Sequence, residues 1–64
     1  MLDRFYVTIF RLNKKPIIRS YKTERRAWNY VHIYITDNTT EPYSILMMQG
    51  YSCLYDFSFE PYSE

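Results

Sequence analysis

The sequence has a single cysteine, Cys53, and a single glycine, Gly50, among its 64 residues. One cysteine cannot form a disulfide within the chain, which excludes a disulfide-stapled secreted scaffold and favours a reducing compartment. The N-terminus shows no basic-then-apolar signal pattern, and no run approaches the ~20 apolar residues that a membrane span needs. We therefore expect no membrane association and a cytoplasmic location.

Residues that carry enzyme chemistry are also scarce. One histidine and one cysteine cannot complete a closed zinc site, the carboxylates lack calcium-loop spacing, and a phosphate-binding loop needs glycines that are missing. A nucleophile and base pair of Cys53 with His32, oriented by Asp37 or Asp56, is the remaining candidate. It is weak because Cys53 falls on the aromatic face of its expected strand, where cysteine acts as a small hydrophobe. We expect no catalysis, no cofactor and no metal.

Charge is divided unevenly along the chain. All eight basic residues lie in residues 1–32, where only Asp3 and Glu24 oppose them, so this half carries +6. Residues 33–64 contain five acidic residues and no Lys or Arg, so this half carries −5, and the total is +1. Two interpretations stay open. The halves pack side by side and neutralise each other, or they form a bipolar surface that steers a charged partner or favours head-to-tail association.

The first third of the chain predicts a β-hairpin. Residues 5–12 and 17–22 are rich in aromatic and β-branched types, and polar residues near Asn13 and Lys14 mark the turn between them. A two-residue turn there would place Ile9 opposite Ile18, on the face that is the better core candidate. The other face would then pair Phe10 with Ile17, Thr8 with Arg19 and Tyr6 with Tyr21.

The middle of the chain predicts a helix over residues 24–36. Thr23 is a suitable N-cap, and Glu24 places a negative charge in the first turn, where the helix dipole favours it. A strand is the competing interpretation, because residues 31–36 are mostly β-formers. The helical wheel favours the helix, because it gathers six apolar or aromatic residues in one arc: Ala27, Trp28, Tyr30, Val31, Tyr34 and Ile35.

The last third contains one ambiguous element and one clear strand. Residues 42–49 fit either a short helix or a strand that turns at Gln49 and Gly50. Residues 51–60 alternate as a half-buried strand, with Tyr51, Cys53, Tyr55, Phe57 and Phe59 on one side. Residues 1–64 are thus expected to form a single small α+β domain. Its hairpin is followed by a helix packed on one face and a C-terminal antiparallel strand, a ββαβ-like order.

Aromatic residues are in excess. Eight tyrosines, four phenylalanines and one tryptophan stand against one alanine and one glycine. Because a chain this short buries only about 60% of its unfolded surface, several rings are expected outside the core. Tyrosine and arginine dominate protein interfaces, so we expect a Tyr/Arg-rich surface that binds a partner. The residues expected to form it are Tyr6, Phe10, Arg19, Tyr21, Arg25 and Arg26.

These features favour a small non-catalytic protein-binding module. The composition, rich in Ile, Tyr, Phe, Asn and Lys, resembles that of small virus-encoded or mobile-element proteins, a resemblance that involves no motif. It implies a phage- or mobile-element-encoded inhibitor or adaptor of a host nuclease, polymerase or defence complex. The alternative is a single-stranded nucleic-acid-binding protein that uses the same aromatic and basic hairpin face. A third interpretation is a structural protein that self-associates as a homo-oligomer through an unpaired sheet edge.

Overall fold

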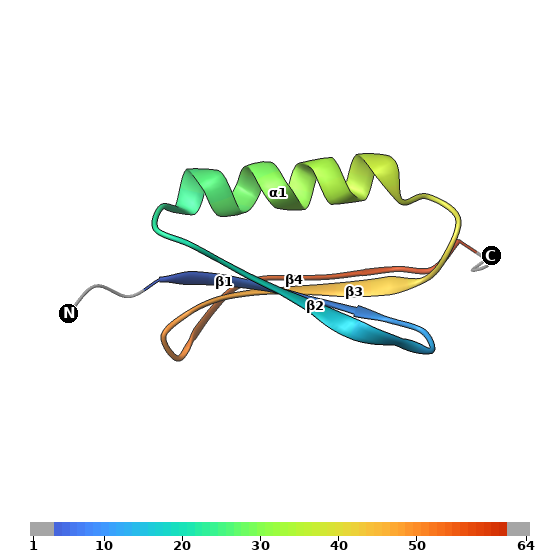
Figure 1. Ribbon diagram of the computed structural model, residues 1–64, viewed down its shortest axis with the longest axis horizontal. Helices are drawn as coiled ribbons and strands as arrows, with labels where there is room; N and C mark the ends of the chain where they lie inside the picture. The colour runs from blue at the N-terminus through green and yellow to red at the C-terminus, as the bar shows by residue number, and fades with distance from the viewer. Residues whose placement is uncertain (1–3, 62–64) are drawn as a thin grey trace.

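Residues 4–61, which the computed structural model describes, form four antiparallel strands and one helix (Figure 1). The elements are β1 (Phe5–Arg11), β2 (Lys14–Tyr21), α1 (Glu24–Asp37), β3 (Tyr43–Gln49) and β4 (Ser52–Phe59). The strand order is β2-β1-β3-β4, and α1 lies along one face of the sheet. The expected α+β class is confirmed, and the ambiguous stretch is the strand β3. No helix formed by the described residues has the length and apolar character that crossing a membrane requires.

The β1–β2 hairpin forms with a different register from the predicted one. Phe5 pairs with Tyr21 and Thr8 with Ile18, so Tyr6 and Tyr21 lie on opposite faces of the sheet. Two local features cause this slip. The turn comes one residue earlier, with Asn13 at a φ of 60°, which asparagine tolerates. A β-bulge then follows opposite Phe10.

A second bulge shapes the β3–β4 hairpin. Gly50 has a φ of 60° in the turn, a conformation that glycine adopts without steric cost. Met47 pairs with Tyr55 but Met48 pairs with Cys53, so one extra residue stands in β4 between them. The extra residue breaks the predicted alternation, because Cys53 leaves the aromatic face. Cys53 is exposed and not buried, which corrects the prediction.

The helix begins and packs as its sequence predicts. The Thr23 side chain accepts a hydrogen bond from the Arg26 backbone N–H at 3.3 Å, which satisfies a donor of the first turn. Trp28 Nε1 donates to Glu24 Oε2 at 3.0 Å, one turn away. All six residues of the expected apolar arc are buried or packed against the core, and Ile33 outside that arc is 60% exposed.

The core lies between α1 and the face of the sheet beneath it. Its buried side chains are Val7, Ile9, Ala27, Val31, Tyr43, Ile45 and Met47. Aromatic rings surround this small centre: Tyr21 contacts Tyr30 on the β2 side, with 5.9 Å between ring centroids, and Trp28 contacts Tyr55 on the β4 side at 4.8 Å. Contacts between aromatic rings thus contribute much of the packing between the helix and the sheet.

Candidate functional site

Most of the described tyrosines belong to the helix–sheet layer. Tyr43 is buried and Tyr21, Tyr30, Tyr34 and Tyr55 are partly buried, all packed within or against the core. Two others, Tyr6 and Tyr51, are exposed, and Tyr62 lies outside the described residues. The expectation that rings remain outside the core therefore holds for fewer tyrosines than the composition suggested.

The expected Tyr/Arg-rich surface is divided between the two faces of the sheet and the first turn of α1. Tyr6 and Phe10 lie on the face of the sheet opposite α1, where they are 43% and 49% exposed. Arg19 and Tyr21 are register partners of Val7 and Phe5 and lie on the helix-covered face. Arg25 and Arg26 are exposed in the first turn of α1. The six residues thus form no single surface, because the register slip moved Tyr21 away from Tyr6.

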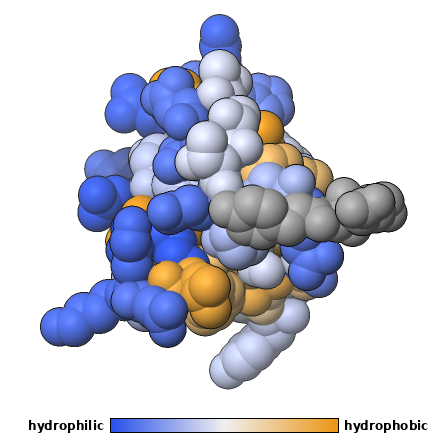
Figure 2. Space-filling model, turned by 90° about the vertical axis from the view of Figure 1, so that its right-hand side faces the viewer, coloured by the Kyte–Doolittle hydropathy of each residue, from blue (hydrophilic) through white to orange (hydrophobic). Residues whose placement is uncertain are grey.

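The face opposite α1, here called the open face, is rich in apolar side chains. No element among the described residues covers it (Figure 1), and in Figure 2 hydrophobic atoms reach the surface on that lower side of the molecule. Ile18 is 63% exposed there. Register and exposure place five apolar residues on the open face: Tyr6, Phe10, Ile18, Leu46 and Met48. Three of these were missed from the sequence, although the nearly continuous apolar run of β3 is typical of a strand that is apolar on both faces.

The sheet keeps the two signs of charge apart. Strands β1 and β2 carry basic residues and no acidic ones, whereas β3 and β4 carry Asp56 and no basic ones. Because the strand order is β2-β1-β3-β4, one edge of the sheet is basic and the other acidic. One ion pair joins the halves at the loops, with Lys14 Nζ 3.7 Å from Glu41 Oε1. The structure thus favours the bipolar interpretation; Asp3 and Glu64 lie outside the described residues.

A hollow of about 440 Å³ lies where β2 leads into α1. Its cationic lining comes from Arg4, Lys22 and Arg26, which precede β1, follow β2 and lie in the first turn of α1. No carboxylate is among the described residues that line it. We call this hollow the basic corner, and its full lining is Arg4, Ser20, Tyr21, Lys22, Thr23 and Arg26. Sequence reasoning found Tyr21 and Arg26 but missed Arg4 and Lys22.

Two side chains of the basic corner are held in place by their neighbours. Arg4 Nε donates a hydrogen bond to Ser20 Oγ at 3.2 Å, and the Tyr21 ring packs against Tyr30. Burial raises the pKa of Tyr21, the nearby Tyr30 raises it further, and Arg19 opposes both effects. The phenol therefore stays protonated at neutral pH and is available as a hydrogen-bond donor.

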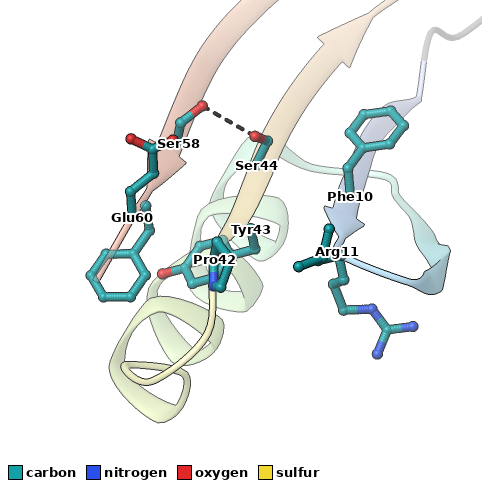
Figure 3. Close-up of a pocket in the computed structure, with 9 residues that line it drawn as sticks. Phe10, Arg11, Pro42, Tyr43, Ser44, Ser58 and Glu60 are labelled. Atoms are coloured by element: carbon teal, nitrogen blue, oxygen red, sulfur yellow. Dashed lines mark hydrogen bonds between the residues drawn. The ribbon is translucent and has the colours of Figure 1, made fainter. Parts of the chain in front are cut away.

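A second hollow, of about 420 Å³, lies at the opposite end of the sheet (Figure 3). Figure 3 shows Arg11 and Glu60 on opposite sides of it, and Ser44 and Ser58 are joined by a 3.1 Å hydrogen bond. Its lining is largely apolar and offers a single carboxylate. This arrangement supplies no acid and base pair for hydrolytic chemistry.

Cys53 and His32, the candidate nucleophile and base, each interact with a different residue of the chain. Cys53 Sγ donates to the Tyr55 carbonyl oxygen at 3.7 Å, and the His32 ring contacts Trp28 on α1 at 6.0 Å. Within residues 4–61 there is also no group of three or more His, Cys, Asp or Glu side chains that could hold a metal ion.

Within residues 4–61, we take the basic corner and the open face as candidate binding surfaces. No protein-family model, no curated protein and no solved structure matches this chain.

Proposed function

We propose that this chain is a non-catalytic module that binds an acidic surface of another protein through the basic corner. The observation that carries the proposal is the convergence of Arg4, Lys22 and Arg26 on one hollow without a neighbouring carboxylate among its described lining residues. Such a concentration of positive charge accelerates encounter with an acidic partner and disfavours basic ones.

The chemistry of the lining favours a protein as the partner. Arginine and tyrosine give a large contact area together with hydrogen bonds, and both are enriched at interface hot spots. Arg4 is already hydrogen-bonded to Ser20, and Tyr21 already packs on Tyr30. Binding therefore costs less side-chain conformational entropy at these two residues. The composition of the chain supports a phage- or mobile-element-encoded inhibitor or adaptor. Its partner would then be a host nuclease, polymerase or defence complex in the host cytoplasm.

Two adjacent arginines provide a matched test. Arg26 lines the basic corner and Arg25 does not, although both are exposed in the first turn of α1. Arg26→Glu and Arg25→Glu change the net charge equally. We expect Arg26→Glu to weaken partner binding about tenfold, equivalent to ~1.4 kcal/mol, and Arg25→Glu to change it far less. The measurement is quantitative affinity capture from host lysate, followed by titration of the captured protein. Unchanged binding by Arg26→Glu, or equal losses in both variants, would contradict the proposal.

Single-stranded nucleic acid is the second candidate ligand, because phosphates also suit three converging cations and Tyr21 offers a ring for stacking. Its signature is an affinity for a labelled oligonucleotide that falls with salt, with a log–log slope of about −0.7 per neutralised phosphate. A shift with that slope, lost in Arg26→Glu, would favour nucleic acid over protein. No shift at low salt would remove this candidate.

A further inference from the structure

The open face lacks a covering layer on the side that α1 leaves free. Ile18, Phe10 and Tyr6 are 63%, 49% and 43% exposed on it, and Leu46 and Met48 lie beside them on β3. A sheet with one face covered by a helix usually carries polar residues on the other face. Apolar side chains gathered on a free face indicate a surface that binds something.

We propose that a second copy of this chain docks on the open face, with β4 of each copy over β2 of the other. This goes beyond the proposed function, because it concerns the face away from α1 and not Arg26 on the helix. Sheets that pack face to face keep their strands roughly aligned. A two-fold axis between two aligned sheets runs either along the strands or across them.

Charge decides between these two axes. An axis along the strands exchanges the edges of the sheet, so the basic β2 edge of one copy faces the acidic β4 edge of the other. An axis across the strands instead places β2 over β2 and β4 over β4. Like charges would then face each other at both edges. The segregation of charge in the sequence therefore suits a face-to-face pair with the axis along the strands.

The register of the sheet determines which residues of the two copies would face each other. Ile18, Thr8, Leu46 and Asp56 are successive partners and form one row across the four strands. A two-fold axis along the strands preserves position along them, so this row lies over the same row of the other copy. Asp56 then faces the position of Ile18, in the strand that also carries the exposed Lys15. The other axis would place β4 over β4 and so bring Asp56 of one copy toward Asp56 of the other.

The size of the open face sets the expected strength. Four strands ~4.8 Å apart, each about seven residues long at ~3.3 Å per residue, give a footprint of roughly 440 Å² per copy. The pair would bury about 900 Å² in total, which is just below the ~1,000 to 1,200 Å² at which stable specific interfaces start and is typical of a weak, transient contact. We therefore expect reversible dimers that form at about micromolar concentrations and dissociate on dilution.

The test is sedimentation equilibrium of the full chain over a wide concentration range, with sign-reversed variants at Ile18. Ile18→Glu would face Asp56 of the other copy and should shift the dimer dissociation constant upward at least tenfold. Ile18→Lys would face the same carboxylate favourably and should keep the dimer. Ile33 on α1 is a matched control, because it is 60% exposed against 63% for Ile18. Ile33→Glu and Ile33→Lys should leave the dissociation constant unchanged.

A charge swap completes the test. Asp56→Lys should weaken the dimer, and combining it with Ile18→Glu should restore much of the loss, because the opposite charges again face each other. Circular dichroism checks that every variant keeps its fold. A wild-type chain that stays monomeric at all concentrations overturns the proposal, as do equal losses in Ile18→Glu and Ile18→Lys. Neither result bears on binding through Arg26.

Discussion

Replacing Tyr43 with phenylalanine should stabilise the protein. The side chain is 5% exposed. Its ring packs edge-on against Tyr34, with 5.0 Å between ring centroids, and in a tilted arrangement against Phe59, with 5.2 Å between centroids. Its hydroxyl oxygen is buried and has no hydrogen-bond partner among the described residues. Burial raises the pKa of this phenol, with smaller contributions from the neighbouring Tyr34 and Tyr55.

The expected gain follows from the cost of a buried hydroxyl without a partner, which is about 1–3 kcal/mol. Phenylalanine keeps the ring and its aromatic contacts while removing that oxygen. The neighbours of Tyr43 can relax around its hydroxyl and remove part of this cost in the wild-type protein. We therefore expect Tyr43→Phe to raise the free energy of unfolding by about 1 kcal/mol, at the lower end of that range. For a domain of this size, such a change raises Tm by about 4–8 °C.

Urea denaturation followed through Trp28 fluorescence measures the free energy of unfolding, and thermal denaturation measures Tm. Tyr51→Phe is the control, because Tyr51 is fully exposed and its hydroxyl is solvated, so its effect should stay within ~0.5 kcal/mol. A Tyr43→Phe protein less stable than wild type by more than that margin would show that the hydroxyl makes a favourable bond. The reasoning from burial would then be refuted.

Three further outcomes are expected. Thr23→Ala removes the N-cap acceptor of α1 and should lower the free energy of unfolding by about 1 kcal/mol in urea denaturation, whereas Thr23→Ser should preserve it. Ile45→Ala leaves a cavity in the fully buried core and should cost about 2–5 kcal/mol, enough to unfold much of so small a domain, which circular dichroism reports. Burial raises the folded-state pKa of Tyr21, Tyr34 and Tyr43. Their contribution to stability is fully present below about pH 10, where unfolded phenols ionise, and is lost as the pH rises through the folded-state values; an alkaline titration of the unfolding midpoint measures this.

The helix was the element best predicted from sequence, because its signals agree with one another. Thr23 caps it, Glu24 favours its first turn, and the arc from Ala27 to Ile35 matches the face that packs on the sheet. Propensity alone favours a strand over residues 31–36. The helical spacing of the apolar residues outweighs this strand propensity, because a helix places Val31 in the core.

The faces of the strands were harder to predict, because each extra residue reverses the side of every position beyond it. The bulge opposite Phe10 and the earlier turn moved Ile18 from the expected core to the open face. The bulge in β4 moved Cys53 away from the aromatic face. The alternation of apolar and polar residues does not show where a β-bulge inserts an extra residue. The expected Tyr/Arg-rich surface therefore combined residues from two faces of the sheet.

Both outer strands carry features that disfavour extension of the hydrogen-bonded ladder into a neighbouring molecule. Their opposite charges would attract β2 of one molecule to β4 of the next, and such head-to-tail joining yields a fibre when the rotation between molecules does not close a ring. Pro16 removes a backbone donor from β2, and each outer strand carries an irregularity that bends it out of line. These features disfavour an endless ribbon of molecules joined edge to edge, while the opposite charges remain at the two edges of the sheet.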